Sequence, residues 1–142
     1  MTYTDYFFRG IRRSLSQVPF HRQMGFIDRY VLLDNGIHPA SDMYIVAHRV
    51  TIENENLIAY TELHQHTEQE VNLVVSAEPG GLTYEFLIDQ TRRIITSPAT
   101  VVIPPNTAHA AKALSGRGWY VCIINAGHYK AHGQGSVEDE KE

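Results

Sequence analysis

Apolar and polar residues follow one another in short segments through most of the chain, and the apolar stretches are rich in Val, Ile, Thr, Tyr and Phe. Short runs of β-branched and aromatic residues, bounded by Gly, Pro, Asn and Asp, are typical of β-strands. Such strands are predicted over residues 43–52, 57–63, 70–76, 82–88, 93–96, 100–103, 108–114 and 119–125. Short strands joined by regular turns, the last of them expected at 115–118, indicate an all-β sandwich or barrel.

The first part of the chain follows a different pattern. Between residues 5 and 18 the apolar residues recur at helical spacing, as Phe8, Ile11, Leu15 and Val18. This spacing predicts an amphipathic helix, capped near Thr4 or Asp5, that covers a sheet or joins a dimer. Turn residues dominate the segment up to residue 41, with one possible strand at 30–33.

These patterns predict a single domain. Residues 1–41 form an N-terminal helix and lead-in segment, residues 42–127 form the β-domain, and residues 128–142 form a polar, acidic tail that is expected to be disordered. A chain of 142 residues buries roughly two-thirds of its unfolded surface, which is enough for a core without disulfides.

Charge and composition narrow the choice of partner. The formal net charge of −4 argues against nucleic acid and against an anionic membrane, because both attract clustered positive charge. A small molecule is the expected partner. No apolar stretch reaches about 18 residues, and no secretory signal pattern is present. The single cysteine, Cys122, is expected to be a buried thiol, as in a reducing compartment. We therefore expect a cytoplasmic protein.

Candidate chemistry begins with His64 and His66. Two residues at alternate positions of an extended segment lie on one face, about 6.6 Å apart, so both rings can converge on one metal ion. The three residues after His66 suit a short hairpin connection, which would bring Glu70 back on the neighbouring strand. The pattern therefore predicts a chelating group of side chains.

A fourth candidate ligand, His109, follows a turn that contains Pro104, Pro105 and Asn106. The two prolines end a strand, and Asn106 tolerates left-handed backbone geometry, which lets the chain re-enter the site. Three imidazoles and one carboxylate leave a divalent ion positively charged, with a position open for water, oxygen or substrate. The set therefore favours a catalytic metal centre over a structural one.

At these positions the sequence resembles the cupin superfamily, whose first motif reads HxHxxxE or HxHxxxxE and whose second reads GDxxxxPxGxxH. The matching residues are His64, His66 and Glu70 in the first motif, and Pro104, Asn106 in place of glycine, and His109 in the second. The resemblance covers roughly residues 44–124. It implies a double-stranded β-helix, which is a jelly-roll barrel, and one divalent metal ion held by the four ligands. Imidazole and carboxylate suit Fe(II), which we favour, and also Mn, Ni and Zn.

Strand parity extends the predicted pocket. If His64 and His66 face inward, Tyr60 and Glu62 share their face, and counting from Glu70 places Asn72 inward. Glu62 is then either a general acid or base, or an acceptor that orients a ligating imidazole. Tyr60 either donates a hydrogen bond to substrate or packs in the barrel, and Asn72 is expected beside the substrate. The other histidines are expected elsewhere: His48 in the core, and His21, His38, His128 and His132 at the surface.

Three functions fit these residues. The first is a metal-dependent cupin enzyme, which we expect to be an Fe(II)-type dioxygenase acting on a small oxygen-bearing metabolite. The second keeps the metal without redox chemistry and is an isomerase, cyclase or lyase in which Glu62 or Tyr60 moves a proton. The third is a non-catalytic module that binds a small ligand. We also expect a homodimer, because open strand edges and the apolar stripe of the N-terminal helix need cover.

Overall fold

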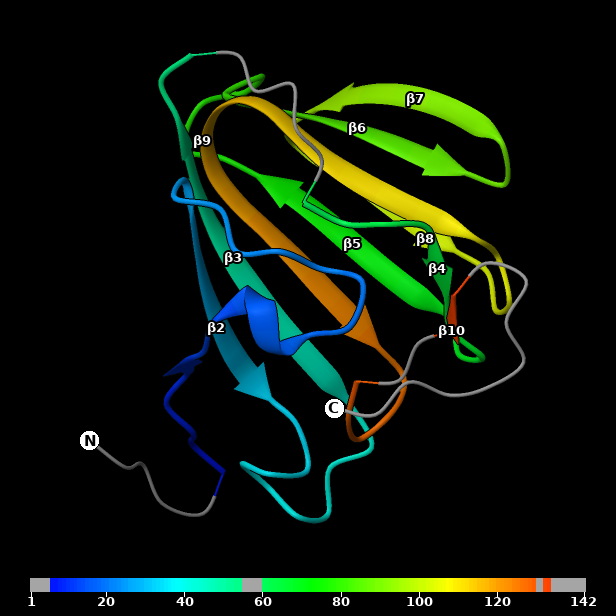
Figure 1. Cartoon of the computed structure of the whole chain (residues 1–142). Helices are drawn as coiled ribbons and strands as arrows, with labels where there is room; N and C mark the ends of the chain where they lie inside the picture. The colour runs from blue at the N-terminus through cyan, green and yellow to red at the C-terminus, as the bar shows by residue number, and fades with distance from the viewer. Residues whose placement is uncertain (1–5, 55–59, 130–131, 134–142) are drawn as a thin grey trace.

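The computed structural model describes residues 6–54, 60–129 and 132–133, and the predicted all-β class is confirmed (Figure 1). Its strands are β1 (Ile11–Arg12), β2 (Ile27–Leu33), β3 (Tyr44–Ile52), β4 (His64–Gln65), β5 (Glu70–Val75), β6 (Leu82–Ile88), β7 (Thr91–Thr96), β8 (Ala99–Ile103), β9 (His109–Ile124) and β10 (His132–Gly133). One turn of 3₁₀ helix, η1 (Leu15–Gln17), accompanies them. Within the described ranges, no helix is long and apolar enough to cross a membrane. Of the tail predicted at 128–142, residues 130–131 and 134–142 lie outside the described residues, as do the first three residues of the strand predicted at 57–63.

Strand β9 connects two groups of strands, and all of its pairings are antiparallel. Its C-terminal half pairs with β3 on one side and β5 on the other, whereas its N-terminal half pairs with β6 and, at His109, with β4. Beyond these neighbours, β2 and β1 extend from β3, β8 from β5, β7 from β6 and β10 from β4. In Figure 1 the yellow and orange halves of this bent strand run through both groups.

Side chains from both groups meet in one core. Val50 and Val74 come from the first group, Leu82 and Phe86 come from the second, and all four are buried in a single hydrophobic cluster. Along β5 and the first part of β6, buried and partly exposed residues alternate, which is the period of two that a half-buried strand requires. The fold is therefore two layers of strands that share β9 and enclose a common interior.

The turn predicted at 115–118 was wrong, because β9 runs through these residues without interruption. Gly116 has a φ of 100° and lies where β9 passes from β6 to β3, next to a register shift in the β6–β9 pairing. A Cβ at this position would overlap the carbonyl oxygen of Gly81. Glycine therefore bends the strand here and does not end it.

Replacing Gly116 by Ala is expected to lower the free energy of unfolding by about 3 kcal/mol, because the new methyl group meets both left-handed strain and a backbone clash. Urea denaturation measures this change. Gly25→Ala is the matched control, since a Cβ at Gly25 meets no atom within 4 Å. Equal denaturation midpoints for the two variants would contradict the assigned role of Gly116.

The N-terminal helix predicted over residues 5–18 was also wrong for the described part of this segment, and residue 5 lies outside it. The chain forms β1 and η1 instead, although Leu15 and Val18 are buried as the apolar pattern indicated. Gly10 weakens a helix at its centre, and Pro19 disfavours helical backbone at Val18. A short helix with two such breaks has too few hydrogen bonds to offset its nucleation cost, so pairing of β1 with β2 prevails.

Candidate metal centre

Three histidines from two distant parts of the chain converge inside the fold. His64 lies in β4, His66 follows two residues later, and His109 begins β9 directly opposite His64 in the strand register. All three are buried, and one ring nitrogen of each lies within 4.8 Å of the others. This cluster can hold a metal ion.

The turn before His109 joins the two motifs. Asn106 adopts the left-handed conformation that its residue type predicts, with a φ of 60°. Its backbone N–H donates to the carbonyl oxygen of His66 at 2.6 Å. The backbone just before His109 is thus fixed to the segment that carries the first two histidines.

Two of the imidazoles are oriented by the backbone just before them. The Nδ1–H of His64 donates to the carbonyl oxygen of Glu62 at 2.7 Å, and that of His109 donates to the carbonyl oxygen of Thr107 at 2.9 Å. This tautomer leaves the Nε2 lone pair of each ring available, which is how metal-binding histidines are commonly held. The rings are therefore arranged to present Nε2 to a common point.

Glu70, the first residue of β5, brings a carboxylate to the same point. Its Oε1 atom lies 2.9 Å from Nε2 of His66 and 3.2 Å from Nε2 of His109. Its Oε2 atom accepts a hydrogen bond of 2.7 Å from the side-chain amide of Asn72. Burial raises the pKa of Glu70, but His109 and His66 outweigh burial and hold the pKa well below its usual value. The group is therefore a carboxylate, and the donor set fits a divalent first-row metal ion.

Protons and a metal ion compete for the histidines of this site. Burial lowers the pKa of His64 well below its usual value, and the charges of His109 and His21 lower it further. Burial also acts to lower the pKa of His109, but the Glu70 carboxylate, whose Oε1 lies 3.2 Å from Nε2 of His109, overcomes this and raises it. A metal ion would compete with the proton that the Glu70 carboxylate favours on His109.

Metal affinity is therefore expected to fall as the pH is lowered through the titration of His109, by up to about tenfold per pH unit for the one proton that the cation displaces. The sign follows from the raised pKa of His109, because protonation begins above the usual value and competes with the cation. Competition titrations of Zn²⁺ against a chromophoric chelator at several pH values measure the slope. An affinity that stays constant over these pH values would contradict this competition.

The cavity around the four residues is small, at about 20 Å³. That volume is close to the space needed for one water molecule. Apart from the four candidate ligands, the residues that line it are mostly aromatic or cationic and include His21, Arg29, His48, Tyr60, Tyr120 and Tyr129. The interior therefore excludes most water from the candidate metal centre.

No protein-family model matches the sequence, and the curated proteins give no significant match. Solved structures do match. A cupin-like protein from Thermotoga maritima is 19% identical with a TM-score of 0.59, and the match covers 95% of this chain and 92% of that one. KdgF from Halomonas sp. is 17% identical with a TM-score of 0.53, covering 75% and 83%. A variant of oxalate decarboxylase from Bacillus subtilis is 14% identical with a TM-score of 0.54, covering 86% of this chain but 32% of that one.

The protein has the cupin fold. The jelly-roll barrel that the motif resemblance implied is thus confirmed, whereas the N-terminal helix expected before it is not seen. At sequence identities of 14–19%, this similarity is a similarity of fold. The cupin fold accounts for the meeting of the two motifs, because β4, β5 and β9 bring them to one end of the barrel interior.

Two of the other predicted site residues, Asn72 and Tyr60, are buried next to the candidate metal centre. Asn72 is fully buried and contacts Glu70, as parity from Glu70 indicated. Tyr60 is buried and lines the cavity, where its hydroxyl donates to that of Tyr84 at 3.2 Å. Burial and the neighbouring Tyr84 raise the pKa of Tyr60 well above its usual value. Tyr60 is therefore a neutral hydroxyl at the cavity wall.

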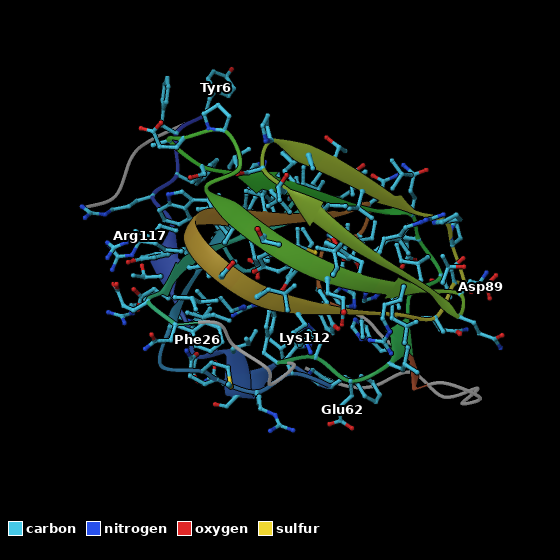
Figure 2. The ribbon with its side chains drawn as sticks, turned by 90° about the horizontal axis from the view of Figure 1, so that it is seen from above. Tyr6, Phe26, Glu62, Asp89, Lys112 and Arg117 are labelled. Atoms are coloured by element: carbon cyan, nitrogen blue, oxygen red, sulfur yellow. The ribbon has the colours of Figure 1, made fainter. Side chains whose placement is uncertain are left out.

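The prediction that Glu62 faces the cavity was wrong. Its side chain is exposed and points outward at the edge of the molecule (Figure 2), and only its carbonyl oxygen contacts the site, through His64. The parity count assumed one continuous strand from residue 57 to residue 63. Tyr60 and Thr61 are instead both buried in succession, and a bend at Leu63 precedes β4.

Several cavity residues were not singled out as site residues by the sequence. His21, expected at the surface, lines the cavity, and burial lowers its pKa to about 4. Tyr129, from the segment expected to be a tail, is buried against His66 with ring centroids 5.2 Å apart. Arg29 and His48 also line the cavity, from β2 and β3. The alternation of residues 27–33 could have indicated an inward Arg29, because Ile27 and Val31 share its face.

Proposed function

We propose that the protein is a metal-dependent enzyme of the cupin type that acts on a small oxygen-bearing metabolite, with Fe(II)-dependent dioxygenation as the favoured reaction. The observation that carries the proposal is the convergence of His64, His66, His109 and Glu70 in a buried cavity. A divalent ion held by such a set would polarise substrate oxygens or activate dioxygen. The four ligand side chains would hold the metal ion, and the other cavity residues would exclude water and orient the substrate.

The acid–base groups at the cavity support the redox reaction over proton transfer. Of the two residues expected to move a proton, Glu62 lies at the surface and Tyr60 has a pKa raised far from the neutral range. A general acid or base works best when its pKa lies near the working pH. Oxygenation of a substrate that chelates through two oxygens makes less use of such a group.

A non-redox isomerase, cyclase or lyase is the second candidate, and one observation favours it. His48 lines the cavity, and neither of its ring nitrogens has a hydrogen-bond partner within the described part of the chain. Burial holds the pKa of His48 well below its usual value, so this imidazole is neutral and one of its nitrogens could accept a proton from a substrate. One of the fold neighbours is, by its name, a decarboxylase, and this also keeps a non-redox reaction in view.

Turnover with and without oxygen separates the two candidates. Fe(II)-loaded protein is incubated with a panel of small enols, keto acids and catechols, and loss of each compound is measured in air and under anaerobic conditions. Dioxygenation predicts that the reaction stops without oxygen. Undiminished anaerobic turnover would eliminate the dioxygenase and favour the second candidate. If His66→Ala retains full affinity for a compound that the protein binds but never converts, the protein is a binding module.

We also propose that the protein is a cytoplasmic homodimer whose partner molecule is a small metabolite and not nucleic acid or a membrane. Support for the dimer comes from large apolar side chains that are exposed on three strands, namely Ile94, Val102 and Trp119, because exposed apolar patches commonly mark interfaces. Light scattering is expected to give twice the chain mass of 16.1 kDa. A particle of 16.1 kDa at all concentrations would contradict the dimer.

A further inference from the structure

Arg29 is a buried cation in the barrel that has no carboxylate partner among the described residues. Its side chain is 6% exposed in total, and its guanidinium donates to the hydroxyl of Tyr44 at 2.7 Å. Buried charges in proteins are usually paired, because an uncompensated charge in a poorly solvated site is costly. A neutral phenol does not supply that compensation, so Arg29 is suited to an anion that comes from outside the chain.

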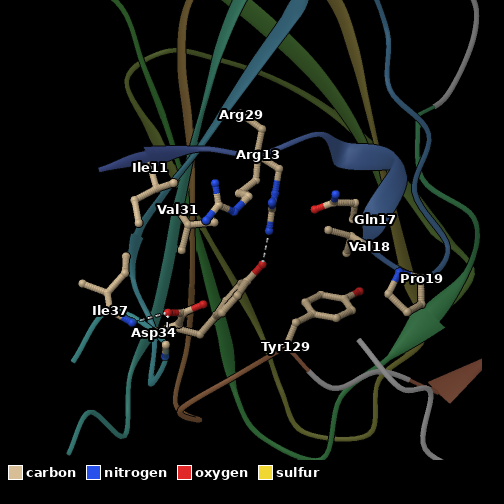
Figure 3. Close-up of a pocket in the computed structure, with 12 residues that line it drawn as sticks. Ile11, Arg13, Gln17, Val18, Pro19, Arg29, Val31, Asp34, Ile37 and Tyr129 are labelled. Carbon is tan, nitrogen blue, oxygen red and sulfur yellow. Dashed lines mark hydrogen bonds between the residues drawn. The ribbon is translucent and has the colours of Figure 1, made fainter. Parts of the chain in front are cut away.

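The position of Arg29 links the candidate metal centre to the surface. Arg29 lines the small cavity that contains the four candidate ligands and also a larger outer pocket of about 290 Å³. Tyr44 and Tyr129 line both spaces as well. Figure 3 shows Arg29 and Arg13 on one wall of the outer pocket, with Tyr129 across from them. A small molecule that enters this pocket therefore meets Arg29 before it reaches the metal ligands.

His48 provides a second polar group on the same face. It lies directly opposite Arg29 in the β2–β3 register, and directly opposed residues of antiparallel strands project to the same side. His48 is 3% exposed, and neither ring nitrogen has a hydrogen-bond partner among residues 6–54, 60–129 and 132–133. Burial lowers its pKa well below the usual value, with further contributions from His21 and Arg29. A neutral imidazole still has one N–H to donate.

The acidic groups nearby are already engaged. Asp34 faces the outer pocket, but its Oδ1 atom accepts the backbone N–H groups of Gly36 and Ile37, both at 3.0 Å. Glu70 is occupied by Asn72, His66 and His109. Neither carboxylate is paired with Arg29 in the structure. The charged residues that line the outer pocket are Arg13, Arg29 and Asp34, so its formal charge is positive.

We propose that Arg29 and His48 form a subsite for the carboxylate group of a small substrate, next to the candidate metal centre. The planar fork of a guanidinium matches a carboxylate better than it matches a single phenol oxygen, and charge-assisted hydrogen bonds of this kind are the stronger ones. The proposal rests on the proposed function and narrows its substrate class to small carboxylic acids. The carboxylate would replace the Tyr44 hydroxyl as the acceptor for Arg29.

Acetate is the probe, and acetamide is its uncharged match. Each is titrated into the Zn²⁺-loaded and the metal-free protein, and amide chemical shifts measured by NMR give the dissociation constant. Wild-type protein is expected to bind acetate and not acetamide. Arg29→Met is expected to weaken acetate binding about tenfold or more, and Arg29→Lys, which keeps the charge without the fork, is expected to weaken it less. His48→Phe is expected to weaken it by a smaller factor, because it removes a neutral donor.

Arg49→Met is the matched control, since Arg49 is exposed on β3 and pairs with Asp28, and its loss should leave acetate binding within about twofold. The subsite is overturned if wild type binds acetate no better than acetamide, or if folded Arg29→Met and Arg29→Lys both bind acetate as wild type does. Metal titration keeps the two proposals separate. Arg29-dependent acetate binding in a protein that takes no metal would remove the proposed function alone, whereas metal binding without acetate binding would remove the subsite alone.

Discussion

Replacing His66 by Ala is expected to weaken the binding of a divalent metal ion by about a hundredfold or more, because the change removes a ligand and not only a group that orients one. His66 is buried and its Nε2 lies 2.9 Å from the Glu70 carboxylate. Removing the imidazole therefore takes away one donor and, among the described residues, leaves His109 as the one imidazole in ion-pair contact with Oε1 of Glu70. Competition titrations with Zn²⁺ and Mn²⁺ against a chromophoric chelator measure the loss.

His128→Ala is the matched control for this experiment. His128 is exposed and lies outside the cluster, so its removal should leave the high-affinity site intact while eliminating adventitious binding by that side chain. A second variant, His66→Gln, fills more of the space that alanine leaves empty. If both His66 variants are folded and bind metal as tightly as the His128 variant, the four residues are not the metal site.

Acid is expected to destabilise the metal-free protein steeply below about pH 6.5. His21, His48 and His64 all have lowered pKa values, each mainly through burial. The unfolded chain takes up protons at these groups near the usual histidine value, whereas the folded protein does not, so the stability present above that value is lost as the pH falls. Each group contributes about 1.4 kcal/mol per pH unit, which gives about 4 kcal/mol per unit for the three together.

The window of this effect follows from the direction of each shift. For His21 the stability is lost between pH 6.5 and about pH 4. His109 has a raised pKa, so its contribution is already complete below the usual value and does not oppose the loss. Urea denaturation at pH 7.5, 6.5 and 5.5 in the presence of a chelator measures the slope. His48→Phe should reduce the slope by about one third, and an unfolding free energy that is unchanged across this range would contradict the buried, neutral histidines.

Local residue patterns predicted the strands well where one face is buried along the whole segment. The buried and partly exposed residues of β6 alternate from Leu82 to Phe86, and the strand spans residues 82–88 as expected. The four candidate ligands also come together, because the HxHxxxE spacing and the turn at Asn106 are local geometric features that the fold retains.

The errors arose where distant contacts override a local pattern. Gly116 and Gly118 looked like turn residues, but close approach to Gly81 and Val75 makes glycine necessary inside a continuous strand. Glu62 was assigned to the cavity because the count could not include the bend at Leu63. Arg29 and His48 lie outside the two metal-binding motifs in the sequence. The pairing of β2 with β3 places them beside the cavity.

The hydrogen bonds from His64 and His109 to carbonyl oxygens two positions earlier have a consequence for how the centre tolerates change. Both acceptors are main-chain atoms, of Glu62 and Thr107. The orientation of each imidazole ring therefore depends on the local backbone conformation. It does not depend on the side chains at positions 62 and 107. Residues 62 and 107 can therefore vary in chemistry without loosening the imidazoles, provided that they are not proline or another residue that alters the local path of the chain.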